Sequence, residues 1–254
     1  MTTLDPTEGP DGTGSVATRV LGGFAIVGIA LLTYLSFVVS GPDTELGETV
    51  RLIYVHVPAA TLAYVGCSIV TLGSAMYLWK RSQGWDVLAH AAAQLAALYT
   101  ALTLVTGSLW GRPTWGVYWI WDARLTSTAM LFLLLLGYLA IRRVPAESGL
   151  RARRAAVLGC LLVPNVIIVN RSVEWWRTLH QKSTLIQLDP RIEGWQLFTL
   201  FVGFVVGGLV FAWLLIHRFR VVWLEQEVEE SGLTLAIEER RAEAGSPTAA
   251  EVTP

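Results

Sequence analysis

Long apolar runs alternate with short polar segments along most of the chain. A helix that crosses the roughly 30 Å hydrocarbon core of a bilayer needs about 20 largely apolar residues. Six runs are predicted as such spans: Val20 to Ser40, Leu52 to Trp79, Val87 to Leu109, Leu125 to Ile141, Ala155 to Asn170 and Gln196 to His217. The fourth and fifth runs are short, and we expect the Arg side chains beside them to extend to the membrane interface and so make up the missing length. The pattern predicts an all-α, polytopic membrane protein, a bundle of six transmembrane helices.

The composition agrees with a membrane protein and excludes two classes of function. Of the 254 residues, 53% are hydrophobic and only 15% are charged, against about 25% charged in soluble chains. A net charge of -1 offers no basic surface to nucleic acid. No Gly-rich phosphate-binding loop occurs, which excludes ATP hydrolysis by that route. Cys67 and Cys160 lie singly within apolar runs and are interpreted as buried apolar residues.

Basic residues predict the orientation in the membrane. The segment 142–154 carries five arginines, and Lys80, Arg81, Arg218 and Arg220 fall on the same predicted side. Because cytoplasmic loops are rich in Lys and Arg, both termini are expected in the cytoplasm. We therefore expect residues 1–19 to form a disordered cytoplasmic leader, 20–218 the six-span membrane domain, and 219–254 a cytoplasmic tail. The loops 41–51, 110–124 and 171–195 then face outward.

Tryptophan is concentrated on the predicted outer side. Seven of the 11 tryptophans lie in or beside the outer loops: Trp110, Trp115, Trp119, Trp121, Trp175, Trp176 and Trp195. An aromatic belt at the membrane interface is the alternative interpretation, but a belt should serve both faces. The stretch 110–124 has too many Gly and Pro residues to continue a span, and it is predicted as a short amphipathic platform at the interface. If helical, it would place Trp115 and Trp119 on one face, where indole rings can stack against a large flat ligand.

Two histidines accompany this Trp-rich loop. His56 lies at the outer end of the second span, and His180 lies in the last outer loop. Two neutral imidazoles from separate segments can bind one haem iron from opposite faces. A hydrogen-bonded surface histidine is the plainer alternative for each. His90 and His217, near the inner ends of spans, are interpreted as structural.

Charged residues on the outer side suit the propionates of haem, because Arg can hold a carboxylate through two hydrogen bonds. The candidates are Arg112, Arg124, Arg171, Arg177, Lys182 and Arg191. Asp122 has two possible roles in this sequence. It can orient Arg124, or it can cap the fourth span, which starts with Leu125.

The stretch from Trp110 to Ser127, WGRPTWGVYWIWDARLTS, resembles the tryptophan-rich signature of the haem-handling membrane proteins of cytochrome c maturation. Within that group the chain is most similar to the CcmC family. The segments YVHVPAA around His56 and VEWWRTLHQ around His180 fit that family, as do the chain length and the six spans. The resemblance covers roughly residues 20–218. Tyr118 departs from it, because Trp is the more usual residue there.

The resemblance implies a function and a set of site residues. It implies a protein of the bacterial inner membrane that binds haem b transiently and without a covalent bond at the periplasmic face, and delivers it to the haem chaperone CcmE. His56 and His180 would be the axial ligands. The haem platform would consist of Trp110, Trp115, Trp119, Trp121, Asp122 and Arg124. The family works with the subunits CcmA, CcmB and CcmD, and ATP is hydrolysed by CcmA, so this chain is expected to be a transfer component and not an enzyme.

Three other functions stay open at this point. A haem lyase that attaches haem to apocytochrome belongs to the same group of proteins, but such chains are typically larger. A membrane electron-transfer cytochrome would need histidine pairs at membrane depth on facing helices. A permease would need charged residues to mark its path through the bundle, and the predicted spans contain almost none.

Overall fold

The computed structural model describes residues 14–44, 46–180 and 194–245. In chain order its elements are α1 (Val16–Tyr34), the π-helix η1 (Leu35–Val39), the 3-10 helix η2 (Glu48–Leu52), α2 (Ile53–Lys80), α3 (Gln83–Trp115), α4 (Ala123–Ile141), α5 (Ser148–Cys160), α6 (Leu162–Trp175) and α7 (Gly194–Gly245). The residues described here form no β-strand. Residues 1–13, most of the predicted leader, lie outside the described residues.

The six predicted spans are confirmed. Within the described part of the chain, six helical segments are long and apolar enough to cross a membrane: Val16–Val39, Glu48–Lys80, Gln83–Trp115, Ala123–Ile141, Ser148–Trp175 and Gly194–Arg241. The protein is therefore a multi-pass, all-α membrane protein.

The ends of several spans differ from their predicted positions. The helix α1 begins at Val16, inside the segment expected as leader, because Ser15 caps it by accepting a hydrogen bond from the Thr18 backbone N–H. The last span does not stop near His217, since α7 continues without a break to Gly245. The segment from residue 219, expected as a cytoplasmic tail, thus begins as a continuation of this helix, because charged residues can extend a helix beyond the bilayer.

The fifth span is longer than predicted and is broken in its middle. The helices α5 and α6 together cover 28 residues, so this span does not depend on Arg side chains to reach the interface. The break falls at Leu161, whose backbone N–H bonds to the carbonyls of both Val157 and Leu158. Pro164 lies just beyond it, and proline has no N–H to give to the carbonyl four residues earlier. The fifth span is thus divided into two helices just before Pro164.

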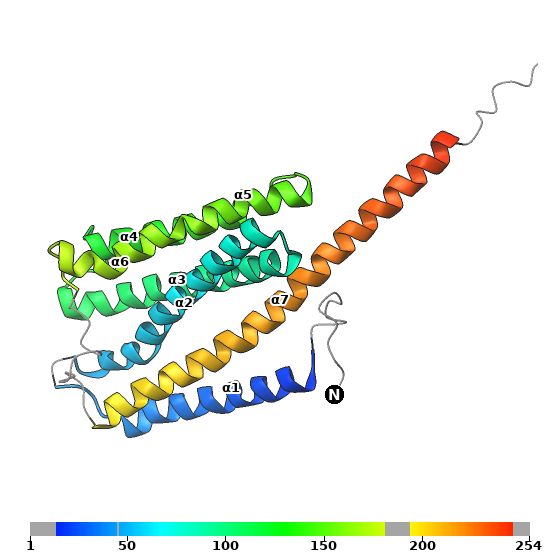
Figure 1. Ribbon diagram of the computed structural model, residues 1–254. Helices are drawn as coiled ribbons and strands as arrows, with labels where there is room; N and C mark the ends of the chain where they lie inside the picture. Colours follow the sequence, from blue (N-terminus) through cyan, green and yellow to red (C-terminus); the bar gives the residue numbers. More distant parts are fainter. Residues whose placement is uncertain (1–13, 45, 181–193, 246–254) are drawn as a thin grey trace, which may run out of the picture.

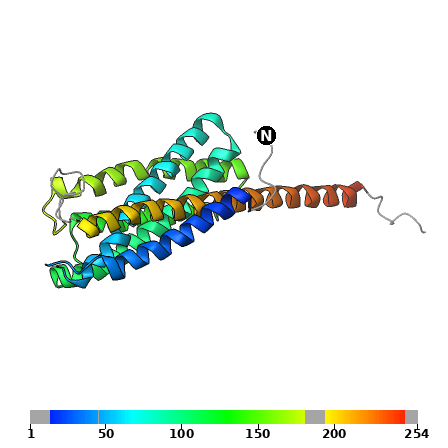
Figure 2. The same cartoon turned by 90° about the horizontal axis from the view of Figure 1, so that it is seen from below.

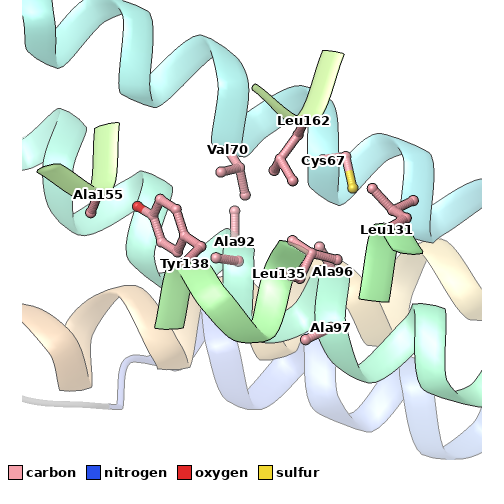
Figure 3. Packing of buried hydrophobic residues seen from close by; sticks show 11 residues of the cluster. Cys67, Val70, Ala92, Ala96, Ala97, Leu131, Leu135, Tyr138, Ala155 and Leu162 are labelled. Carbon is pink, nitrogen blue, oxygen red and sulfur yellow. The ribbon is translucent and has the colours of Figure 1, made fainter. Parts of the chain in front are cut away.

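The helices form three layers (Figure 1). The helices α2 and α3 lie in the centre, α1 and α7 lie along one side, and α4, α5 and α6 cover the other. Figure 2 shows the same bundle from below, with α7 projecting beyond it as a single long helix. The main core lies between the central layer and α4 to α6, where Cys67 and Val70 of α2 meet Leu131, Leu135 and Tyr138 of α4 (Figure 3).

Small residues bring the central helices close together. A Cβ atom on Gly66 or Gly73 of α2 would lie 3.0 Å from the Cβ atom of Ala96 or Ala89 of α3, so any larger residue would push the two helices apart. A glycine also allows α7 to approach α2 closely, because a Cβ atom on Gly203 would lie 2.6 Å from the Tyr54 carbonyl oxygen. Such approaches are typical of membrane helices, where packing rather than water exclusion drives association. They fix the start of α2, which carries His56.

The opposite end of the bundle is held by ion pairs. Arg142, directly after α4, donates two hydrogen bonds to Asp86 of α3, at 2.6 and 2.7 Å. Gln226 of α7 donates to the same carboxylate at 3.1 Å. Arg151 of α5 makes a second bidentate pair with Glu229 of α7, at 2.8 Å. These contacts attach the projecting part of α7 to the helices beside it.

Candidate functional site

The residues predicted to bind a ligand meet in a pocket at one end of the bundle. The pocket has about 510 Å³ of empty space, a volume that includes open solvent. Its lining comes from α2, α3, the loop between α3 and α4, α4, α6 and the chain after α6: His56, Ala60, Tyr64, Thr103, Leu104, Gly107, Ser108, Trp119, Arg124, Leu125, Thr128, Val169 and His180. We call it the histidine pocket. Four of the eight predicted site residues, His56, His180, Trp119 and Arg124, line it directly.

His56 enters the pocket from the first turns of α2 and is held by α3. Its Nδ1 lies 2.9 Å from the Thr106 hydroxyl oxygen. A Cβ atom on Gly107 would lie only 3.0 Å from its Cε1, so the imidazole packs directly on the helix backbone. The ring of Trp110 lies 5.9 Å from the imidazole, centroid to centroid. Trp110 therefore supports His56 from behind and does not line the pocket.

His180 reaches the same pocket from the chain that follows α6, where the backbone is irregular. Its ring meets Trp115 edge to face at 4.8 Å, and its Nδ1 lies 3.8 Å from Asp122 Oδ2, too far for a hydrogen bond. Burial and the positive charge of Arg124 lower the pKa of His180 to about 4, although Asp122 opposes this shift. The imidazole is neutral at pH 7, which is the form that can bind a metal.

Asp122 has two different environments at its two oxygens. Oδ1 accepts a hydrogen bond from the Leu125 backbone N–H at 2.8 Å and so caps the start of α4. Oδ2 is buried beside His180 and has no hydrogen-bond partner. Of the two roles considered for Asp122, capping is confirmed, and no hydrogen bond joins it to Arg124 among the contacts of the described residues.

The Trp-rich loop is built differently from the predicted platform. The helix α3 continues through Pro113 to Trp115, where Gly116 ends it in a left-handed conformation (φ 81°). Residues 117–122 are irregular, so Trp115 and Trp119 do not share a helix face. The expectation that Gly and Pro end the span before this stretch is wrong, because α3 passes through Gly111 and Pro113, although Pro113 has no N–H to give to the carbonyl four residues earlier.

The four tryptophans of this loop have separate positions. Trp110 and Trp115 each contact one of the two histidines. Only Trp119 lines the pocket, and Trp121 meets it edge to face at 5.6 Å while remaining 81% exposed. The indoles thus form a support for two imidazoles rather than one continuous flat surface.

Arg124 is the basic residue that lines the pocket. It is oriented by α6, because its side chain donates to the Asn170 carbonyl at 3.3 Å and to the Ser172 hydroxyl at 3.4 Å. Arg112 instead donates to the Gly116 carbonyl and lies over the ring of Tyr118. Tyr118 does not line the pocket, so its departure from the usual Trp leaves the lining unchanged. Lys182 and Arg191, two other candidates, lie outside the described residues.

Sequence reasoning missed Thr106 and Gly107. Each is a common residue within an apolar run, and neither belongs to the Trp-rich motif. The one available signal is spacing, since Thr106 lies one helical turn before Trp110. That signal would have required knowing that α3 continues beyond residue 109.

The side chains that line the pocket have the chemical groups that haem binding requires. Two imidazoles are available for iron, one indole can lie against a flat macrocycle, and one guanidinium can pair with a carboxylate. Three buried polar atoms close to the pocket lack a hydrogen-bond partner, namely Trp110 Nε1, Asp122 Oδ2 and His180 Nδ1. Unpaired buried groups are rare in native proteins and point to a ligand or a functional constraint. Within the described residues, no three His, Cys, Asp or Glu side chains converge to hold a bare metal ion.

Comparison with known proteins gives one consistent result. The family model for CcmC, described as heme exporter protein C, matches residues 10–234. The heme exporter protein C of Escherichia coli strain K12 is 35% identical over 212 residues, which cover 80% of this chain and 83% of that protein. That of Bradyrhizobium diazoefficiens is 44% identical over 146 residues, 58% of this chain and 56% of that protein. A putative ccmC-like mitochondrial protein of cytochrome c biosynthesis from Marchantia polymorpha is 37% identical over 73% of this chain and 79% of its own length.

Proposed function

The chain belongs to the CcmC family of heme exporter proteins, and from this premise we propose that it holds haem b, without a covalent bond, in the histidine pocket at the outer face of the bacterial inner membrane. From there it delivers haem to the chaperone CcmE. The chain is a transfer component of cytochrome c maturation and not a catalyst.

One observation carries this proposal. His56 and His180 belong to segments far apart in the sequence, yet both line the histidine pocket. A pair of neutral imidazoles facing one space is an arrangement that can ligate haem iron on both faces.

Arg124 and Trp119 supply the remaining contacts. Arg124 is the candidate for a propionate, because it lines the histidine pocket and Arg112 does not. Trp119 offers its ring to the macrocycle. Trp121 projects outward beside it, and an exposed indole next to the pocket is suited to contact a chaperone that approaches from the periplasm.

Charge supports the proposed orientation and partners. The basic residues Lys80, Arg81, Arg142 and Arg151 lie at the end of the bundle opposite the histidine pocket, as their positions in α2 to α5 require. By the positive-inside rule this end faces the cytoplasm. The projecting part of α7 is then on the same side as the ATP-hydrolysing subunit CcmA, and CcmB and CcmD complete the proposed assembly within the membrane.

Visible absorption of the purified protein in mild detergent, prepared with haem present, tests the proposal. His56→Ala and His180→Ala should each lose haem or shift it from six-coordinate to five-coordinate iron. His217→Ala is the matched control, because His217 contacts Trp213 within α7 and does not line the pocket. Equal haem and equal spectra in all four proteins would refute the site. Transfer to CcmE is measured separately, as covalent haem on the chaperone, and should fail in both pocket variants.

A further inference from the structure

Three neighbouring residues of α3 fix the position of the His56 ring. Thr106 contacts Nδ1, Gly107 lies against Cε1, and Trp110 packs near the ring. Trp110 lies four residues after Thr106 and three after Gly107, and both spacings make neighbours on a helix surface. The backbone of Thr103, one turn earlier in α3, also lies against the His56 ring, and His56 lines the histidine pocket.

The contact with Thr106 defines which ring nitrogen carries the proton. The Thr106 hydroxyl lies 2.7 Å from the Leu102 carbonyl oxygen, one helical turn earlier. A hydroxyl has one proton to donate, and a carbonyl can only accept it. When the hydroxyl gives this proton to Leu102, its oxygen accepts from the Nδ1–H of the neutral His56 imidazole. Nε2 then keeps its lone pair.

His180 lacks such a fixed partner. Its Nδ1 is buried without a hydrogen bond, and the nearest acceptor, Asp122 Oδ2, is 3.8 Å away. Asp122 cannot turn freely toward it, because its other oxygen caps α4. The two histidines of the pocket are thus supported unequally, one by a formed hydrogen bond and one by ring contact with Trp115.

We infer that Thr106 is a positioning residue: it holds His56 as its Nδ1–H tautomer in the empty protein, so that Nε2 is presented to the pocket as a pre-set ligand. His180 is the ligand that adjusts when haem enters or leaves. Partners of the second ring nitrogen are known to set the orientation and basicity of metal-binding histidines in general. The role of haem here rests on the proposed function, but the state of His56 does not.

The first experiment therefore uses the protein without haem. The chain has four histidines, and ring-nitrogen NMR of the ¹⁵N-His-labelled protein in detergent distinguishes the two tautomers of each. The His56 signal is identified by its loss in His56→Gln. Wild type should show His56 as a single Nδ1–H tautomer. In Thr106→Val, which keeps the shape and removes the hydroxyl, the signal should move toward a mixture of tautomers, and Thr106→Ser should restore it.

Thr100→Val is the matched control. Thr100 lies in the same helix, is buried, and donates to the carbonyl four residues earlier, Ala96, at 2.6 Å, as Thr106 does to Leu102. It does not line the histidine pocket. The same loss of a Thr hydroxyl should therefore leave the His56 tautomer unchanged, which separates positioning from a general effect on α3.

The second experiment is a haem titration followed by absorbance. Thr106→Val should weaken binding about tenfold, the usual effect of removing a partner of a ligating histidine, while Thr106→Ser and Thr100→Val should bind as wild type. The inference is overturned if the NMR spectrum shows both tautomers of His56 in wild type, or the same tautomer in wild type and Thr106→Val. This holds even if haem binds normally. If the tautomers behave as expected but wild type binds no haem, the positioning by Thr106 stands and the proposed function fails.

Discussion

Gly107→Ala should weaken haem binding without weakening the fold. The Cβ atom of the alanine would lie 3.0 Å from His56 Cε1, so the ring must move away by a few tenths of an ångström. Its 2.9 Å hydrogen bond to Thr106 is then stretched or lost. A single hydrogen bond contributes about 1 kcal/mol, and about 1.4 kcal/mol is tenfold in affinity, so the dissociation constant should rise about fivefold.

The thermal stability of Gly107→Ala, unlike its affinity for haem, should stay the same or rise slightly. Alanine is favoured over glycine within a helix by about 1 kcal/mol, so the variant should melt at the same temperature as wild type or slightly above it. Gly208→Ala in α7 is the control, because nothing lies within 4 Å of its added Cβ atom. It gains the same helix preference and leaves His56 untouched.

The assay pairs haem titration by absorbance with thermal unfolding in one detergent. The expected result is weaker binding only in Gly107→Ala, with no loss of thermal stability in either variant. Wild-type affinity in Gly107→Ala would refute the assigned position of the imidazole against α3. A fall in both affinity and melting temperature would show instead that the helices had separated.

Three further predictions concern other parts of the structure. Arg142→Met leaves the Asp86 carboxylate, which is 7% exposed, with Gln226 as its remaining partner, and should destabilise the protein by about 3–5 kcal/mol. Adding Asp86→Leu should recover much of this lost stability, as measured by thermal unfolding. Equal melting temperatures of the single and double variants would contradict the argument. Trp119→Ala should reduce haem affinity more than Trp121→Ala in the same titration, since only Trp119 lines the pocket. Arg124→Gln should weaken binding of haem but not of its dimethyl ester, which has no free propionates, and an equal effect on both ligands would remove Arg124 from the propionate site.

The membrane architecture could be predicted from the sequence because one physical requirement determines it. A span needs a certain length of apolar residues, and this length is visible without knowledge of any contact. The ends of spans were less predictable. The helix α3 passes through Gly111 and Pro113 to Trp115, where neighbouring helices outweigh local propensity. The helix α7 continues through a charged segment that projects beyond the bundle, because its Glu, Leu, Ala and Arg residues favour a helix by themselves.

The site was predictable only where side chains have distinctive chemistry. His56, His180, Trp119 and Arg124 carry imidazole, indole or guanidinium groups that suggest a ligand by themselves. Thr106 has no such signal, because its role depends on the register between α2 and α3. That register is set by contacts such as those of Gly66 and Gly73 with the alanines of α3, which the apolar pattern alone does not specify.

Unequal support of the two histidines matters for a protein that must pass its ligand on. If two axial ligands were held with equal rigidity, neither bond would be the first to open, and the cargo would be stored. Here His56 comes from a helix fixed by close contacts with α3 and α7, whereas His180 follows α6 in irregular backbone. Loops can change conformation without disturbing the packed elements that they join. If the pocket holds haem as proposed, release that starts at His180 would leave the bundle intact and would keep the cargo on His56 until an acceptor has replaced the first ligand.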